Sequence, residues 1–326
     1  MQIIDQDNKQ EINVTQSAYD LVVIGDINAD LILKGDVVPA FGQVEQLIDT
    51  ADLVMGSSAV IFACGAARLG LRTAFIGTVG DDIFGKFMIN SMNERGIDTS
   101  AVIVDLKIQT GLTVILAKGI DRAILTFPGS IPALIYEIIN FDLVKKCRHL
   151  HLSSFFMLDK LRPDIAKLFK KVKDLGLSIS LDTNYDPAEK WNDGLFDALK
   201  YVDVLLPNDT EAKAIAGTEN IKDALGTLVD CCATVAVKMG KDGALAQHRD
   251  GSFIQQKVTP LEVVDTVGAG DSFDAGFIYG YLQQWDLKET LRLAVACGSL
   301  STQKAGGTDG QPDITGALDF IKNKKL

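Results

Sequence analysis

The sequence is poor in the residues that bind metals or cross-link small folds. Its 326 residues include only three histidines and five cysteines. The cysteines are scattered at positions 64, 147, 231, 232 and 297, with no C-x-x-C spacing. Zinc clusters and disulfide frameworks need such residues in close, regular spacing, so this pattern argues against both. An odd number of scattered thiols favours a reducing compartment, and we expect a cytoplasmic protein.

Positive charge and long apolar runs are also scarce. The formal net charge is −11, so no basic field exists to attract nucleic acid or an anionic membrane surface. No uncharged apolar run approaches the roughly 18–20 residues that a membrane-spanning helix needs. The first ten residues are polar and acidic, unlike a signal peptide. The sequence therefore predicts no nucleic-acid partner and no membrane partner, and any bound phosphate has to be held locally.

What is present is an ordinary globular composition, with 47% hydrophobic and 23% charged residues. Short apolar runs, many of them β-branched, predict buried parallel strands. These runs lie at 20–25, 73–77, 149–152, 177–181, 202–206 and 234–238. Helix-length segments lie between most of them, for example at 61–69, 82–95, 162–175 and 210–216. This alternation predicts an α/β fold with a doubly wound, mostly parallel sheet flanked by helices.

Two stretches interrupt the alternation. Residues 29–55 and 107–127 have strand-like patterns with Gly and Pro punctuation and no helix long enough for a crossover. The second is typical of a hairpin that turns near Lys118–Asp121. We interpret both as a small β-sheet lid on one domain over 19–326, after a polar lead-in over 1–18. The alternative is that they add edge strands to the main sheet.

The segment with the clearest chemistry lies near the C-terminus. A short apolar lead enters Gly268-Ala269-Gly270, and a predicted amphipathic helix begins at about Asp271. Glycines allow a tight turn whose N–H groups face a ligand, and the helix N-terminus adds its unpaired N–H groups and positive dipole end. This predicts a phosphate site, beside which the Asp271 carboxylate is placed to take a proton from an attacking hydroxyl. The alternative from these residues alone is that Asp271 only caps the helix.

The longer string closely resembles the C-terminal signature of the ribokinase family, the PfkB-type carbohydrate kinases. It reads Asp265-Thr-Val-Gly-Ala-Gly-Asp271-Ser-Phe and is followed by Ala275-Gly276-Phe277. Further landmarks occur in the family's order from about residue 20 to 315. The resemblance implies a kinase in which Asp271 is the catalytic base and Gly268, Ala269 and Gly270 form the anion hole.

The resemblance also implies an acceptor site near the N-terminus. Gly25-Asp-Ile-Asn-Ala-Asp30 is similar to the family's first strand and turn, and implies that Asp30, with Asn28 nearby, binds substrate hydroxyls. The family's first signature, Gly-Gly with a later sugar-binding Asn, is altered. Gly56 fits the first Gly, Ser57 replaces the second, and Ile61 stands at the Asn position. We expect contacts from Gly56, Ser57 and Ser58 instead, and an acceptor that differs from ribose.

The nucleotide side is implied by three further segments. Asn208-Asp-Thr-Glu211 is a capping box in isolation, and in the family these positions organise Mg²⁺, through water at Glu211, and the phosphates. Lys238-Met-Gly240-Lys-Asp-Gly243 resembles the turn that borders ATP. Asp182 and Asn184 follow a strand that ends at the site, where local capping explains them equally well. The resemblance further implies a potassium-like site at Asp265, Val267 and Gly306.

The sequence therefore predicts an ATP- and Mg²⁺-dependent transfer of the γ-phosphoryl group to a hydroxyl of a sugar or sugar-like substrate. Two alternatives stay open: an adenosine-type nucleoside kinase, for which Ile61 beside Phe62 would suit a purine face, and a non-catalytic nucleotide or sugar sensor. A homodimer through the lid is compatible with the strand edge at 107–127.

Overall fold

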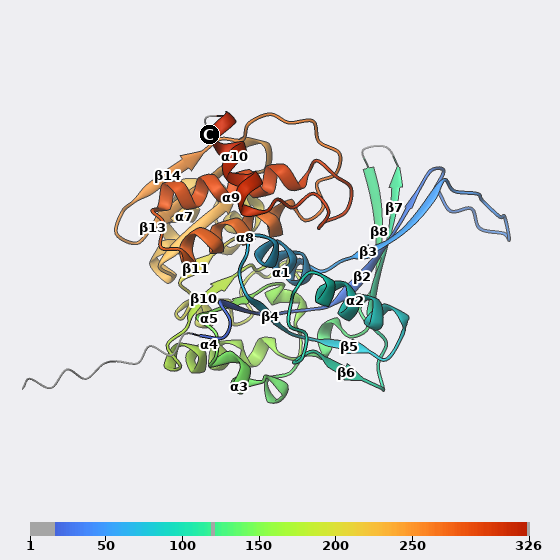
Figure 1. Cartoon of the computed structure of the whole chain (residues 1–326), viewed down its shortest axis with the longest axis horizontal. Helices are drawn as coiled ribbons and strands as arrows, with labels where there is room; N and C mark the ends of the chain where they lie inside the picture. The colour runs from blue at the N-terminus through green and yellow to red at the C-terminus, as the bar shows by residue number, and fades with distance from the viewer. Residues whose placement is uncertain (1–16, 119–120, 325–326) are drawn as a thin grey trace, which may run out of the picture.

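A computed structural model describes residues 17–118 and 121–324 (Figure 1). Most of the predicted lead-in and the tip of the predicted hairpin lie outside the described residues. An eight-stranded sheet forms the centre, in the order β14-β13-β12-β11-β10-β9-β1-β4. Neighbours from β12 to β4 pair in parallel, whereas β13 and β14 add an antiparallel edge. Its strands are β1 (Leu21–Ile24), β4 (Thr73–Ile76), β9 (His149–Leu152), β10 (Ser178–Leu181), β11 (Val204–Leu205), β12 (Thr234–Lys238), β13 (Ala244–His248) and β14 (Phe253–Gln256).

All six strands expected from the apolar runs are confirmed in this sheet, and helices cover both of its faces. Successive side chains of β1 point to opposite faces, because a strand has a period of two. Val22 and Ile24 join one buried cluster, and Leu21 and Val23 join the other. The helices are α1 (Ser58–Arg68), α2 (Ile83–Glu94), α3 (Phe141–Val144), α4 (Ile165–Asp174), α5 (Leu195–Leu199), α6 (Asp209–Ala216), α7 (Ile221–Cys231), α8 (Ala269–Leu282), α9 (Leu287–Ser301) and α10 (Ile314–Lys324).

The two interrupting stretches form a separate sheet, here called the small sheet, which projects from the α/β body (Figure 1). Its order is β3-β2-β7-β8, in which β2 pairs parallel with β7 and the other pairs are antiparallel. Its strands are β2 (Asn28–Lys34), β3 (Thr50–Met55), β7 (Gly111–Lys118) and β8 (Asp121–Phe127). The alternative, that these stretches extend the main sheet, is wrong.

One pair of strands was not predicted. β5 (Thr78–Gly80) and β6 (Ile103–Asp105) form a two-stranded parallel sheet beside α2. Three-residue strands carry too short an alternation to be distinguished from a turn in the sequence. Among the described residues, no helix is both long and apolar enough to cross a membrane.

The strand order fixes where a ligand should bind. The chain moves from β1 to β4 on one side, then returns to β9 on the other side of β1. In open α/β sheets, ligands bind outside the carboxyl ends of the strands at such a reversal. The carboxyl ends of β1 and β9 therefore mark the expected site.

Candidate active site

Polar side chains follow the strands at this edge of the main sheet. Asp26 comes after β1, Ser153 after β9, and Asp182 after β10, while Asn208 follows β11 and Lys238 ends β12. Asp26, Ser153 and Asp182 are all buried. Parallel strands place their carboxyl ends side by side, so residues more than 200 positions apart in the chain meet here.

A cavity of about 660 Å³ opens at this edge. Predicted site residues from both halves of the chain line it: Ser58, Asn184, Asn208, Glu211, Lys238, Gly240, Gly243, Ala269, Gly270 and Asp271. It also has an apolar wall, unassigned from the sequence, at Val258, Leu261 and Val263.

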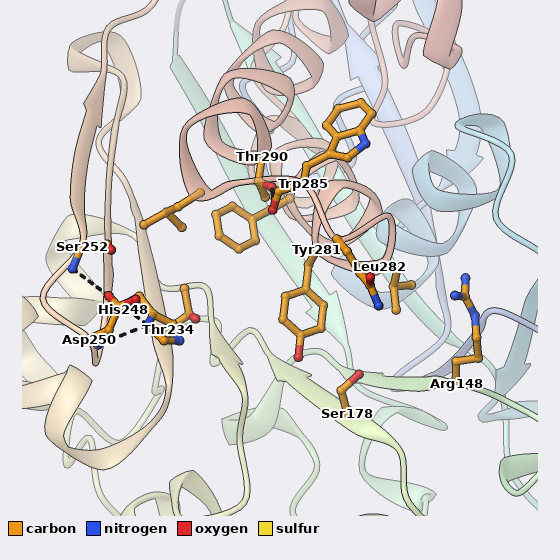
Figure 2. A pocket seen from close by; sticks show the side chains of 13 residues that line it. Arg148, Ser178, Thr234, His248, Asp250, Ser252, Tyr281, Leu282, Trp285 and Thr290 are labelled. Carbon is orange, nitrogen blue, oxygen red and sulfur yellow. Dashed lines mark hydrogen bonds and ion pairs between the residues drawn. The ribbon is translucent and has the colours of Figure 1, made fainter.

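A second cavity, of about 590 Å³, lies at the opposite edge of the sheet (Figure 2). Its lining includes Arg148, which precedes β9, and Ser178 and Thr234, which begin β10 and β12. The Tyr281 hydroxyl points toward Ser178 (Figure 2). No predicted site residue lines this second cavity.

Helix α8 starts at the glycine turn, two residues earlier than predicted. Gly268 is its N-cap with φ of 70°, and a Cβ there would lie 2.7 Å from Gly307 Cα. Only glycine satisfies both conditions without strain. Ser272 N–H donates to Gly268 O at 2.9 Å, so the preceding N–H groups of Gly270 and Asp271 have no acceptor four residues earlier within the helix. The first turn thus offers backbone donors for an anion.

The rest of α8 also differs from the prediction. We expected an amphipathic helix, but every residue from Asp271 to Ile278 is buried. The reason is that α8 packs against both α1 and α9. A helix that is covered on several sides has no need of a polar, solvent-exposed face. Its polar residues Asp271, Ser272 and Asp274 therefore face other parts of the protein.

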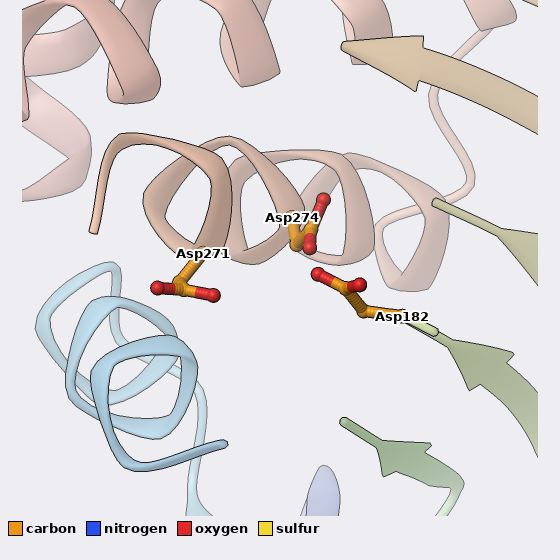
Figure 3. A group of neighbouring side chains, drawn as sticks. All are labelled: Asp182, Asp271 and Asp274. Carbon is orange, nitrogen blue, oxygen red and sulfur yellow. The ribbon is translucent and has the colours of Figure 1, made fainter. Parts of the chain in front are cut away.

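Three carboxylates converge at the start of this helix (Figure 3). Asp274 projects from α8 toward Asp182, which follows β10, and Asp271 projects from the same side of α8 one turn earlier. One oxygen of each of the three lies within 4.8 Å of the others. Lys238 Nζ is 2.9 Å from Asp182 Oδ2 and 2.9 Å from Asp274 Oδ2. The pairing of Lys238 with Asp274 was not predicted from the sequence. The signal that could have found it is the spacing of Asp274, three residues after Asp271, which puts both on one side of a helix.

Burial and crowding set the charges of these groups. Burial, with a contribution from Asp182, raises the pKa of Asp271 to about 7. Burial also raises the pKa of Asp274 well above its ordinary value. Burial opposes ionisation of Asp182 as well, but the Lys238 ammonium outweighs it and lowers the pKa of Asp182. Lys238 and Asp182 therefore form the ion pair, and Asp271 is poised to exchange a proton near neutral pH.

The capping box on α6 is confirmed. Glu211 N–H donates to Asn208 Oδ1 at 2.8 Å, and Asn208 N–H donates to Glu211 Oε2 at 2.9 Å. Burial, with repulsion from Asp182, raises the pKa of Glu211. Asn184 N–H donates to Asp182 Oδ1 at 2.8 Å, and its side-chain amide lies 3.4 Å from Ser58 Oγ. Asn184 and Ser58, the first residue of α1, both line the cavity.

The residues predicted to bind the acceptor come together on β2 and at the start of α1. Asn28 Nδ2 donates to Asp30 Oδ1 at 2.8 Å and lies 3.3 Å from Thr113 Oγ1. A Cβ on Gly56 would lie 2.2 Å from Asp30 Oδ1, so only glycine lets the chain pass this carboxylate. Burial, with repulsion from Asp26, raises the pKa of Asp30 to about 6.

Asp26 was missed as a site residue, although it stands in the turn after β1. Its carboxylate is buried, and its Oδ1 has no hydrogen-bond partner among the described residues. Its charge contributes to the raised pKa of both Asp30 and Asp271. Asp26 therefore lies near both the acceptor residues and the start of α8.

Ile61, which stands at the Asn position of the altered signature and which would suit a purine face, is a core residue. Its side chain would meet a Cβ on Gly307 at 2.5 Å and one on Gly268 at 2.8 Å. Ile61 is 4% exposed. It packs under the glycine turn as part of the core, and the interpretation of Ile61 as a purine contact is not supported.

Asp265 links the glycine turn to the loop after α9. Its Oδ1 accepts from Val267 N–H at 3.0 Å, and its Oδ2 accepts from Gly306 N–H at 3.0 Å. The three residues predicted for a potassium-like site are therefore adjacent. Gln311 reinforces the same region, since its Nε2 donates to Ile61 O at 2.8 Å and lies 3.1 Å from Ser272 Oγ.

Comparisons with known proteins identify the family of the chain. Residues 18–314 match the model of the pfkB family carbohydrate kinases. An uncharacterised sugar kinase of Archaeoglobus fulgidus is 32% identical over 76% of this chain and 98% of its own length. The ATP-dependent ribose-1-phosphate kinase of Halopiger xanaduensis is 31% identical over 92% of this chain and 97% of its own.

Among solved structures, Arabidopsis thaliana ribokinase complexed with ribose and ATP is similar, with a TM-score of 0.81 and 27% identity. The match covers 94% of this chain and 99% of that one. With the family match spanning the main sheet, the small sheet and α8, the chain belongs to the PfkB family of carbohydrate kinases.

Proposed function

We propose that this kinase transfers the γ-phosphoryl group of ATP to a hydroxyl of a sugar or sugar-like substrate, with Asp271 as the base. The observation that carries the proposal is the placement of Asp271. It lies in the first turn of α8, beside the free N–H groups of the glycine turn, and its pKa is raised to about 7. A base that exchanges protons near neutral pH suits removal of a hydroxyl proton.

Phosphoryl transfer mainly needs the protein to position the reactants and to stabilise the charge that develops on the transferred group. The acceptor oxygen forms a bond to the γ-phosphorus while the bond to the bridging oxygen of ADP breaks, and the hydroxyl proton passes to Asp271. The backbone N–H groups of the Gly268-Ala269-Gly270 turn would hold the transferred group as an anion hole. The helix N-terminus adds its dipole to the same donors.

The cavity supports a nucleotide on the side of β11 and β12. Asn184, Asn208, Glu211 and Lys238 supply polar groups, and Gly240 and Gly243 bring backbone close to the ligand. Glu211 would hold Mg²⁺ through water, since hard cations prefer carboxylate and water oxygens. The similar ribokinase of Arabidopsis thaliana binds ribose and ATP, which favours the same pair of ligand classes here.

The acceptor would lie between the main sheet and the small sheet, against Asn28, Asp30, Gly56, Ser57 and Ser58. A carboxylate and an amide in contact recognise neighbouring hydroxyls by charge-assisted hydrogen bonds. We propose that the small sheet acts as a lid that excludes water from the transfer. A Cβ on Gly306 would lie 3.8 Å from Val54 of β3, so the loop after α9 already reaches the small sheet.

Two further features complete the proposal. The adjacency of Asp265, Val267 and Gly306 supports a monovalent cation site whose ligands would include carbonyls of these loops. The exposed edge strand β8 carries Ile124, Leu125 and Phe127, which are 55%, 62% and 49% exposed. Such an edge favours pairing with a second copy, so we propose a homodimer through the small sheet.

The test is release of ADP from Mg²⁺-ATP with a panel of sugars, sugar acids and nucleosides, with and without potassium. We expect turnover with a sugar-like acceptor that rises with pH through about 7, because Asp271 has to be ionised to accept the proton. Asp271→Asn should lower turnover by roughly 10²- to 10⁴-fold and leave ATP binding intact. Asp319→Asn, at an exposed position of α10, is the matched control.

Each outcome decides between functions. Turnover with nucleosides and not with sugars would identify a nucleoside kinase. ATP binding without turnover on any acceptor would favour a sensor. Full activity in Asp271→Asn would refute the assignment of the base.

A further inference from the structure

Lys238 occupies an unusual place for a buried cation. It is the last residue of β12, and its side chain is 14% exposed. Its Nζ donates to Asp182 Oδ2 and Asp274 Oδ2, both at 2.9 Å, and these side chains are 8% and 1% exposed. The ammonium therefore joins the ends of β10 and β12 to the first turns of α8.

The same ammonium lies against the glycine turn. A Cβ on Gly270 would be 3.6 Å from Lys238 Cδ and 3.7 Å from its Nζ. Gly270 supplies one of the backbone N–H groups without an acceptor in the helix, and both residues line the 660 Å³ cavity. The absence of a side chain on Gly270 thus leaves the ammonium open to whatever binds at the anion hole.

The hydrogen-bonding capacity of Lys238 is not used up. An ammonium group has three donors, and the two carboxylates take two of them. No third acceptor is found for Lys238 Nζ among residues 17–118 and 121–324. On the carboxylate side, Asp274 Oδ1 is buried without a partner in the same part of the chain.

Stability alone does not account for this cluster. Buried ion pairs often stabilise no more than apolar side chains of similar volume. Here three carboxyl groups lie within 4.8 Å of one another, and the ionised Asp182 would repel an incoming phosphate if no cation were held beside it. The cavity lining includes two lysines, Lys238 and Lys241, of which Lys241 is exposed. Lys238 is the one fixed beside the turn.

We propose that Lys238 is a further residue of the phosphoryl-transfer site, whose ammonium contacts an oxygen of the γ-phosphoryl group. Asp182 and Asp274 hold the ammonium beside Gly270, and the third N–H donor points at the transferred group as its charge redistributes. This inference rests on the proposed phosphoryl transfer. In chemical terms, Lys238 complements the backbone anion hole with a full positive charge.

The first test separates this role from a structural one by working in a charge-balanced background. Lys238→Met alone leaves Asp182 buried without its cation and should lower the melting temperature. In Asp182→Asn the ammonium still contacts Asp274. Adding Lys238→Met then removes the cation without leaving an ionised partner, because burial raises the pKa of Asp274 well above its ordinary value and keeps it protonated. We expect the double variant to melt close to Asp182→Asn, yet to have a kcat lower than Asp182→Asn by roughly 10²-fold or more. Equal kcat values in these two variants would overturn the inference.

The second test restores the charge chemically. Treating Lys238→Cys with 2-bromoethylamine rebuilds an ammonium on a stem of nearly lysine length. Recovery of kcat after treatment, with treated wild type as the control for the natural cysteines, supports the contact. Recovery of the melting temperature without recovery of kcat would refute it.

A binding measurement tests the Lys238 contact separately from the proposed function. The contact is to the γ-phosphoryl group, so Lys238→Met should weaken Mg²⁺-ATP binding more than Mg²⁺-ADP binding. An unchanged ratio of the two affinities by calorimetry counts against the contact. Absence of wild-type turnover on every acceptor would instead count against the proposed function, whatever the ratio.

Discussion

Lowering the pH should destabilise this fold through a buried chain of histidines and serines between β9 and β10. His149 Nδ1 lies 2.7 Å from Ser178 Oγ and its Nε2 lies 2.7 Å from Ser180 Oγ. His151 continues the chain, with Nδ1 at 2.7 Å from Ser180 Oγ and Nε2 at 2.8 Å from Ser153 Oγ. Both imidazoles are completely buried, so protonation would place a charge in the core.

The pKa of His151 sets the size of the effect. Burial lowers the pKa of His151 from 6.5 to about 3, and burial lowers that of His149 well below 6.5. The unfolded chain binds a proton near pH 6.5 and the folded chain does not, so stability is lost as the pH falls from 6.5 toward 3. The slope is about 1.4 kcal/mol per pH unit per histidine, so His151 alone should cost about 3 kcal/mol at pH 4.5. That is a large part of a typical total stability of about 5–15 kcal/mol.

The measurement is urea unfolding of wild type and His151→Gln between pH 7 and pH 4.5. Carboxylates with raised pKa values act in the opposite direction, but they are common to both proteins and cancel in the difference. The variant should be less stable at pH 7 and should lose less stability on acidification, so the two curves converge. Ile179→Val, a small change in the buried core of β10, is the control and should give a curve parallel to wild type. Parallel curves for His151→Gln would refute the reasoning.

Two further predictions concern the acceptor site and the small sheet. Gly56→Ala should raise KM for the acceptor and leave KM for ATP unchanged, because the added Cβ would displace Asp30 and Asn28. The control is Gly226→Ala in α7, where a Cβ meets nothing within 4 Å, and it should change neither KM value. Leu125→Lys on β8 should shift the proposed dimer to monomer in sedimentation velocity at unchanged melting temperature, and a wild type that sediments as a monomer would exclude the dimer.

Much of the fold was predictable because its signals are local. The strands of the main sheet are short apolar runs, and β1 shows why: all four of its side chains are buried, two against each face. The two sheets could also be distinguished, since no helix separates β2 from β3 or β7 from β8. The short strands β5 and β6, in contrast, depend on pairing between segments about 25 residues apart, and pairing leaves no mark in a three-residue run.

The site was predictable where a backbone conformation demands a residue type. The glycine turn before α8 is such a case, because Gly268 has a positive φ and contacts Gly307. The charge network was not predictable, because Asp182, Lys238 and Asp274 lie on three elements separated by 56 and 36 positions. Only the folded sheet brings these side chains within hydrogen-bonding distance.

The altered signature at the start of α1 shows how a departure from a family pattern can preserve a site. Ser57 stands where the family has a second glycine, and its φ is positive, at 70°. Its Oγ donates to Asp26 O at 2.8 Å and accepts from Val60 N–H at 3.3 Å, which offsets the strain of a side chain there. Four residues on, Ile61 fills the space beneath Gly268 and Gly307. The altered signature thus forms an ordered backbone that places Ser58 in the lining of the cavity, as a working site requires, which supports the proposed kinase over a decayed one.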